Sequence, residues 1–230
     1  GVMARVLITG ANKGIGLEMA KQYVEKGDEV IACVRNPQGA TELNELASGG
    51  KVTVEAMDVG DPQSIASARD RIGDGPIDIL INNAGAVGGA QQSIDDVDIE
   101  EWHKTLDVNT IGPLLIARAF KPNLAASGDG KLMTVTSQLA ASTWPMGGMY
   151  IYSSTKAGVS KVCQALALDW KDEPITVALM HPGWVKTDMG GPHAELTAQD
   201  SAAGIISVID GLTKADSGKF YKWNGEIHPW

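Results

Sequence analysis

Short apolar runs alternate with longer stretches of helical character along the whole chain. Runs such as VLITG, DILINN and KLMTVTS are almost entirely apolar, which is typical of strands that helices cover on both faces. The alternation predicts βαβ units that build a parallel sheet. We expect strands at residues 5–9, 29–34, 52–57, 77–82, 132–137, 176–180 and 219–223, and helices at residues 15–26, 41–47, 62–72, 100–120, 152–170 and 198–209.

Seven strands and six helices in this order predict a doubly wound α/β sandwich, with a parallel sheet between two helical layers. The length of 230 residues fits one domain over residues 1–230, which can bury roughly 70% of the unfolded surface. Glycine-rich stretches at residues 84–90 and 147–148 are expected to be loops at strand ends. Ligands bind at such strand ends in open α/β sheets.

The net charge of −9 disfavours nucleic acid or an anionic membrane as the main partner, because phosphate binding needs a cationic field. No apolar run approaches the ~20 residues of a membrane span, and no secretory signal precedes the first strand, so we expect a cytoplasmic protein. Gly1 and Val2, ahead of Met3, are interpreted as a remnant of expression. Cys33 and Cys163 lack CxxC spacing and nearby histidines, so no metal site is suggested.

A glycine-rich turn, TGANKGIG at residues 9–16, follows the first expected strand and leads into the first helix. A helix N-terminus presents free backbone N–H groups and a positive dipole end, which suit a pyrophosphate. A flexible turn that merely contains glycines is the alternative, and the flanking strand and helix favour the binding site. The expected cofactor-binding residues here are Gly10, Asn12, Lys13, Gly14, Ile15 and Gly16.

The end of the second strand indicates which dinucleotide fits. An acidic residue there would bond the ribose 2′-hydroxyl of NAD, but this sequence continues with Arg35 and has no carboxylate at that point. Arg35, with Lys13 as a second cation, suits the 2′-phosphate of NADP. We therefore expect NADPH, with NAD still possible and a merely solvated Arg35 as the alternative. Further expected contacts are Asp58 and Val59 near the adenine, and Asn83, Ala84 and Gly85 along the far side of the cofactor.

The motifs resemble those of the classical short-chain dehydrogenases/reductases over almost the whole chain. They are TGANKGIG from Thr9, DV from Asp58, NNAG from Asn82, Asn109, Ser137, the Tyr152-x-x-x-Lys156 pair and His181-Pro182-Gly183. Each motif is weak alone, whereas their order and spacing are specific. The spelling NKGIG, the run VIACVRNP and the ending SGKFYKWNGEIHPW resemble the carbonyl-reductase-like branch that includes C-factor-type proteins. The resemblance implies a Rossmann fold and an NADP-dependent oxidoreductase.

Carbonyl reduction explains why the family uses four side chains. Hydride addition to a carbonyl needs a proton for the forming alkoxide and donors that stabilise its charge. Tyr152 is the expected proton donor, and its pKa of ~10 must fall toward neutrality. Lys156 follows one helical turn later on the same face, so its ammonium would favour the phenolate and hold the nicotinamide ribose. The resemblance implies that Ser137 donates to the substrate oxygen and that Asn109 holds a water of the proton relay.

Some of these roles have rival residues. Thr136 and Ser142 are weaker candidates for the role of Ser137, because the interval to the tyrosine is a residue or two longer than is usual in the family. Tyr150 has no lysine four residues after it, and His181 is not expected to act as a base. In the family, the stretch after the sixth strand contacts the nicotinamide carboxamide. Its expected contacts here are Pro182, Gly183, Val185 and Thr187.

Two loops, residues 139–149 and 184–198, are expected to bind the small-molecule carbonyl or alcohol substrate. Their apolar side chains predict an open site for a hydrophobic substrate, unless they only pack the loops onto the body. These side chains are Trp144, Met146, Met149, Trp184 and Met189. The resemblance also implies a homodimer or homotetramer. A cofactor-binding signalling or regulatory protein of C-factor type is the alternative function, and the complete catalytic set favours an enzyme.

Overall fold

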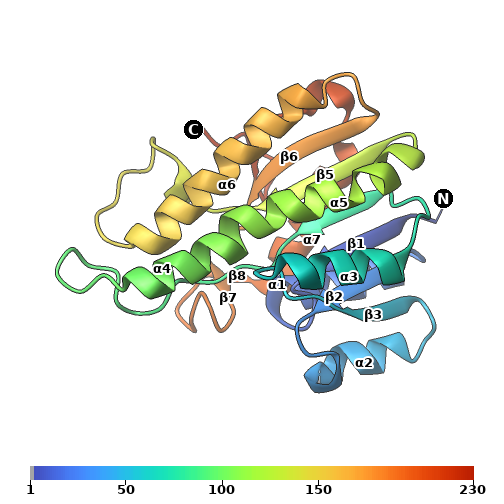
Figure 1. Cartoon of the computed structure of the whole chain (residues 1–230), viewed down its shortest axis with the longest axis horizontal. Coiled ribbons are helices and arrows are strands. Elements are labelled where there is room, and N and C mark those ends of the chain that lie inside the picture. Colours follow the sequence, from blue (N-terminus) through green and yellow to red (C-terminus); the bar gives the residue numbers. More distant parts are fainter. Residues whose placement is uncertain (1–2) are drawn as a thin grey trace.

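One parallel sheet of seven strands forms the middle of the molecule (Figure 1). The computed structural model describes residues 3–230, so the proposed remnant, Gly1 and Val2, lies outside the described residues. The strands of this sheet, in chain order, are β1 (Arg5–Thr9), β2 (Glu29–Val34), β3 (Val52–Ala56), β4 (Ile79–Asn82), β5 (Gly130–Val135), β6 (Ile175–His181) and β9 (Phe220–Lys222). Each lies within two residues of its predicted bounds.

The strand order is β3-β2-β1-β4-β5-β6-β9, and every neighbouring pair is parallel. The chain builds outward from β1 through β2 to β3, then returns to place β4 on the other side of β1. The order therefore reverses between β1 and β4. Ligands of open α/β sheets bind at the carboxyl ends of the strands at such a point.

Alternating strand residues feed two separate apolar cores. In β1, Val6 and Ile8 face one core and Leu7 faces the other, as the two-residue period of a strand requires. Helices cover both cores, which confirms the predicted doubly wound α/β fold (Figure 1). The core at Val6 is covered by α1 (Gly14–Glu25), α2 (Thr41–Ala47) and α7 (Ala198–Gly211), and the core at Leu7 by α3 (Pro62–Ile72), α5 (Gly112–Ala126) and α6 (Tyr150–Asp169).

The single helix predicted over residues 100–120 is wrong in detail. The structure has α4 (Ile99–Leu106), a π-helical turn over Asp107–Ile111, and then α5, which continues past Pro122 to Ala126. The wider π turn turns Asn109 inward, where its side chain finds hydrogen-bond partners. The extra turn after Pro122 is stabilised because Leu124 is fully buried in the core.

Two short strands outside the main sheet were not predicted. β7 (Val185–Lys186) and β8 (Leu196–Thr197) pair in parallel and enclose the loop between them. Strands of two residues are too short to leave a hydrophobic pattern. The remaining short elements are the 3₁₀ turns Pro37–Gly39, Gln138–Ala140 and Lys214–Asp216. Over residues 3–230, none of the helices combines the length and the apolar character that crossing a membrane requires.

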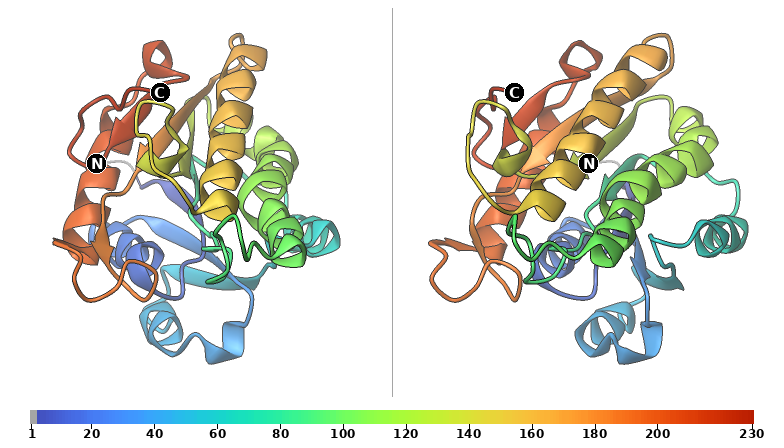
Figure 2. Two further views of the ribbon diagram at one scale, coloured as in Figure 1. Left: turned by 90° about the vertical axis from the view of Figure 1, so that its left-hand side faces the viewer. Right: turned by 60° about the vertical axis from the view of Figure 1, so that its left-hand side comes forward.

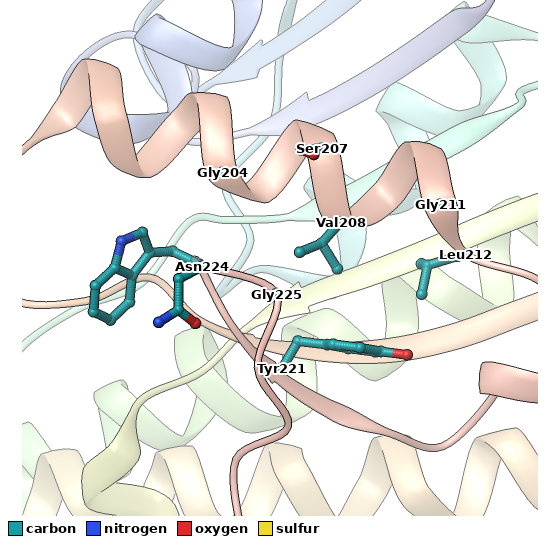
Figure 3. Close-up of a pocket in the computed structure, with 9 residues that line it drawn as sticks. Gly204, Ser207, Val208, Gly211, Leu212, Tyr221, Asn224 and Gly225 are labelled. Atoms are coloured by element: carbon teal, nitrogen blue, oxygen red, sulfur yellow. The ribbon is translucent and has the colours of Figure 1, made fainter.

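Helix α7 packs against the turn that follows β9 through small residues. A Cβ on Gly204 would overlap the carbonyl oxygen of Trp223, so only glycine allows this approach. Farther along the helix the two elements separate and leave a hollow of about 400 Å³ (Figure 3). Gly211 lies at this open end, and an added Cβ there would meet nothing within 4 Å.

We expect Gly204→Ala to lower the free energy of unfolding by about 1–3 kcal/mol, because the new methyl group forces α7 away from Trp223. Gly211→Ala, one heptad later on the same helix, is the matched control and should change it by no more than about 0.5 kcal/mol. Urea unfolding of both variants measures the difference. Equal effects at the two positions would contradict the contact.

The final residues cross back over the end of β6. The His228 ring stacks on Phe220 at 4.7 Å between centroids, and His181 lies edge-on to both Trp223 and His228 at 6.0 and 5.8 Å. Beyond them, the carbonyl of Pro229 accepts a hydrogen bond from the Thr143 hydroxyl at 2.9 Å. Figure 2 accordingly shows the C-terminus beside the loop around residues 141–149.

The pH dependence of stability should reflect His181. Burial, with smaller contributions from His228 and Lys222, lowers the pKa of His181 from 6.5 to about 4. The folded state therefore disfavours the proton that the unfolded chain takes up, and stability falls as the pH drops from 6.5 toward 4. At ~1.4 kcal/mol per pKa unit the loss reaches about 3 kcal/mol.

In His181→Asn the side-chain oxygen replaces Nδ1, which accepts from the Gln138 N–H at 3.2 Å. We expect this variant to lose less unfolding free energy than the wild type between pH 6.5 and 4.5. Urea titrations at several pH values test this. Parallel pH profiles for the two proteins would assign the acid sensitivity to other groups.

Candidate active site

Hydrogen bonds join the turn after β1 to the turn after β4, at the point where the strand order reverses. The Thr9 hydroxyl oxygen accepts from the backbone N–H groups of Asn83 and Ala84, both at 3.0 Å. The Asn83 side-chain amide donates to the carbonyls of Thr9 and Gly10 at 3.2 and 3.3 Å. The glycine turn and the NNAG turn are thus held as one unit, which we call the β1–β4 clasp.

Close packing in the clasp explains the glycines of the turn. Gly10 and Gly14 have φ of +63° and +57°, in the left-handed region that other residues rarely adopt. A Cβ on Gly16 would overlap the Gly10 carbonyl oxygen and lie 2.6 Å from the Asn83 amide nitrogen. The start of α1 can therefore approach the sheet closely only without side chains.

The N-terminus of α1 is suited to an anion. Its N-cap residue, Lys13, makes no side-chain cap, and the first turn carries no acidic residue, so backbone N–H groups remain for a ligand. Asn12 and Lys13 are exposed beside it, and Ile15 is half-buried. The Lys13 ammonium lies 4.0 Å from the exposed Asp188 carboxylate. Such an exposed pair is weak and competes little with a phosphate.

The neighbouring ends of β2 and β3 carry the residues predicted for the adenosine half. Arg35 follows β2 and is exposed, and Asp58 follows β3 with its carboxylate accepting from the Gly60 N–H at 3.0 Å. Val59 is buried. The structure brings a cation to the place where the sequence predicts the 2′-phosphate, with Asp58 at the same edge of the sheet.

The predicted nicotinamide segment faces the glycine turn. A Cβ on Gly14 would lie 3.5 Å from the Thr187 methyl group, so the two segments are in contact distance. Gly183, with φ of +88°, turns the chain after β6, and Val185 is buried in the small β7–β8 sheet. The Pro182 carbonyl accepts from the Ser201 hydroxyl of α7 at 2.7 Å, which fixes the start of this segment.

Ser137, Tyr152 and Lys156 come together where β5 ends and α6 begins. The Ser137 hydroxyl lies near enough to that of Tyr152 to lower its pKa, and the Ser137 oxygen accepts from the Leu139 N–H at 3.1 Å. The Lys156 ammonium is buried, donates to the Val135 carbonyl at 3.2 Å and lies 6.0 Å from the centre of the Tyr152 ring. The spacing of four residues on one helix therefore puts both side chains on one face.

The pKa of Tyr152 in the structure without cofactor is raised, whereas the sequence predicts that it falls. Burial raises the pKa of Tyr152 above its usual value of 10.0, and the neighbouring Ser137 hydroxyl opposes that rise only in part. Burial also lowers the pKa of Lys156 to about 8. Desolvation disfavours the charged form of both groups. The phenol stays protonated at neutral pH, as a proton donor must.

Asn109 joins three parts of the site through its side chain. Its amide oxygen accepts from the Ala86 N–H at 2.9 Å, and its nitrogen donates to the Ala86 carbonyl at 2.8 Å and to the Thr155 hydroxyl at 3.1 Å. A Cβ on Gly85 would lie 3.1 Å from the Lys156 ammonium and 3.4 Å from the Asn109 oxygen. The NNAG turn, the π turn and α6 therefore meet at this asparagine.

The rival residues take other positions. The Thr136 side chain is buried in the core and away from Tyr152. Its hydroxyl bonds to the Lys156 carbonyl at 3.2 Å and to the Ser160 hydroxyl at 2.8 Å. Ser142 lies exposed in the loop, and Tyr150 is partly exposed at the first turn of α6. Ser137 is thus the candidate that contacts Tyr152.

The apolar side chains of the two predicted substrate loops are largely exposed. Trp144, Met146, Trp184 and Met189 expose between 48 and 59% of their surface. This disfavours the alternative that they merely pack the loops onto the body. The Trp184 indole donates to the Gly190 carbonyl at 2.9 Å, which orders the second loop.

Sequence reasoning did not identify Gln92 and Thr155. Gln92 is buried beside Tyr152, and the Thr155 hydroxyl accepts from Asn109. Neither residue stands in a motif, and a buried glutamine in a polar loop leaves no pattern. The only sequence signal is the position of Thr155 between Tyr152 and Lys156.

The comparisons with known proteins agree with this geometry. The family model described as short chain dehydrogenase matches residues 4–197. The "C-signal" of Myxococcus xanthus is 42% identical over 159 residues, covering 68% of this chain and 94% of that protein. The 1-hydroxy-2-glutathionyl-2-methyl-3-butene dehydrogenase of Rhodococcus sp. (strain AD45) is 30% identical over 236 residues, covering 99% of this chain and 100% of that protein.

A solved structure agrees as closely. The crystal structure of NADPH-bound carbonyl reductase from chicken fatty liver superposes with a TM-score of 0.92 at 30% identity and covers 99% of both chains. Membership of one family explains the motifs, the reversal of strand order and the grouping of Ser137, Tyr152 and Lys156. The chain belongs to the short-chain dehydrogenases/reductases, a family of oxidoreductases, in its carbonyl-reductase-like branch.

Proposed function

We propose that this protein reduces a ketone or aldehyde to the alcohol with NADPH, through Asn109, Ser137, Tyr152 and Lys156. The observation that carries the proposal is the grouping of Ser137 and Tyr152 at the end of β5 and the start of α6, with the Lys156 ammonium buried 6.0 Å from the centre of the Tyr152 ring. The NADPH bound to the carbonyl reductase of chicken fatty liver supports the choice of cofactor.

The residues present fit a dinucleotide. The absence of side chains at Gly10 and Gly16 leaves room for a backbone cradle, and the uncapped start of α1 offers N–H donors to a pyrophosphate. Arg35 supplies the cation for a 2′-phosphate. When bound, NADPH supplies the hydride, and the chain's own residues do the rest.

The protein groups handle the proton and the developing negative charge. The Ser137 hydroxyl turns its one proton to the substrate oxygen and orients it beside Tyr152. Tyr152, which is protonated at neutral pH, transfers its phenolic proton to that oxygen as the alkoxide forms. Lys156 stabilises the resulting phenolate, while Asn109 fixes α6 against the NNAG turn and serves the relay that returns a proton.

The exposed aromatic and sulfur side chains of the substrate loops favour a hydrophobic carbonyl and broad specificity. The cytoplasmic location and the homodimer or homotetramer stay predictions, as does the single domain over residues 1–230.

We expect Tyr152→Phe to lower kcat for carbonyl reduction by about 10²- to 10⁴-fold, because the proton donor is lost. NADPH oxidation at 340 nm, measured against ketones, aldehydes and quinones, tests this. Tyr150→Phe, two residues earlier and partly exposed, is the matched control and should retain activity. Undiminished turnover by Tyr152→Phe would remove the tyrosine from the mechanism.

Arg35→Ala should raise KM for NADPH about 10- to 100-fold and leave KM for NADH almost unchanged. The loss of one charge-assisted hydrogen bond, worth about 1.5–3 kcal/mol, sets this range. NADH, which lacks the 2′-phosphate, serves as the internal control. An equal rise for both cofactors would show that Arg35 does not read the phosphate.

A second function is favoured by one observation, the similarity to a protein named C-signal. A cofactor-binding regulator with little turnover would bind NADPH but consume none with any carbonyl. If the wild type binds NADPH tightly and oxidises it with no compound of the panel, the regulatory function replaces the enzymatic one.

A further inference from the structure

The helix that carries Tyr152 does not cap its own N-terminus. Met149, the N-cap residue of α6, adopts the left-handed conformation with φ of 51° and makes no side-chain cap. The first hydrogen bond that returns to it comes from the Ser153 N–H at 2.9 Å. Within residues 3–230, Tyr150 and Ile151 find no acceptor for their N–H groups. The Tyr152 N–H therefore needs a partner from outside the helix.

Gln92, sixty residues earlier in the chain, supplies that partner. Its side-chain oxygen accepts from the Tyr152 N–H at 3.0 Å, and its nitrogen donates to the carbonyls of Val87 and Gly89 at 2.8 and 2.9 Å. Only 5% of Gln92 is exposed, and both of its amide hydrogens are used. A buried amide with this set of partners has one orientation.

The loop that Gln92 holds is the continuation of the NNAG turn. Gly88, with φ of +92°, brings this loop so near α6 that a Cβ would lie 2.5 Å from the Ile151 side chain. Asn109 fixes the same loop at Ala86. The loop thus touches the first turn of α6 at Gln92 and Gly88, and it begins at the cofactor residues of the β1–β4 clasp.

We propose that Gln92 is a positioning residue for Tyr152: it caps the catalytic helix from the NNAG loop and so fixes the tyrosine relative to the cofactor cleft. The inference rests on the proposed function for its catalytic consequence. Its structural part, the bond to the Tyr152 N–H, can be measured without turnover. Misplacement of a reacting group by about 1 Å can cost about 10²-fold in rate, so this fixation matters for kcat.

Amide hydrogen exchange of the wild type tests the bond directly. After correction for local sequence, the Tyr152 N–H should exchange at least about tenfold more slowly than those of Tyr150 and Ile151. The same exchange rate for the three amides would overturn the proposal. This measurement needs no variant and no substrate, so it decides the structural part even if the protein reduces no carbonyl.

Kinetics of Gln92→Met tests the consequence, because methionine keeps the length of the side chain and loses all three hydrogen bonds. We expect kcat to fall about tenfold or more, with KM for NADPH changed less than about threefold. Gln91→Met, at the adjacent exposed glutamine, is the matched control and should stay within about twofold of wild type. A folded Gln92→Met protein with the kcat of the control would overturn the proposal.

Gln92→Glu keeps the acceptor for Tyr152 and gives a readout that simple destabilisation would not produce. The carboxylate form of this side chain has no proton to donate and is repelled by the Val87 and Gly89 carbonyls. The protonated form donates to one of them. Burial raises the pKa of such a group. The ratio of its kcat to that of the wild type should therefore increase as the pH falls from 8 to 5.5, and a ratio independent of pH would count against the proposal.

Discussion

The β1–β4 clasp is the constraint on which the rest of the site depends. A sheet whose strand order reverses between β1 and β4 leaves the carboxyl ends of these two strands side by side with no helix between them. The hydrogen bonds of Thr9 and Asn83 fill this gap and fix the spacing of both turns. Because Asn83 also bonds to Gly10, the same contacts set where α1 begins and where the NNAG loop leaves the sheet.

Burial sets the protonation states of Tyr152 and Lys156. Lys156 is buried and Tyr152 is partly buried, and burial favours the neutral form of each. In an exposed pair of the same residues, the two charges would attract each other weakly through solvent. Here the packing of α6 against β5 desolvates both groups, and this desolvation sets their pKa values. The direction of these two pKa shifts could not be predicted from the sequence, since it depends on how deeply α6 is buried.

The sequence was sufficient wherever a pattern repeats or a motif carries its own geometry. The apolar runs of β1 and β4, the glycines of the first turn and the four-residue spacing from Tyr152 to Lys156 all translate directly into position. The helix predicted over residues 100–120 did not include the π turn at Asn109, because one extra residue in a turn depends on partners such as Ala86 that come from another element. Gln92 was missed because its role comes from a contact sixty residues away in the chain, and β7 and β8 were missed because two residues are too few for a pattern.

The C-terminal segment has a consequence for the order in which the site is completed. The loop that precedes α6 is held at Thr143 by Pro229, which lies 86 residues later in the chain. During synthesis the segment from β1 to β4 emerges and can pack before the residues around Pro229 leave the ribosome. Nascent chains that already contain the glycine turn and the NNAG turn would thus still lack the contact that fixes the loop before α6. The order of the elements along the chain therefore means that the β1–β4 turns can form before the loop that precedes α6 is fixed in place.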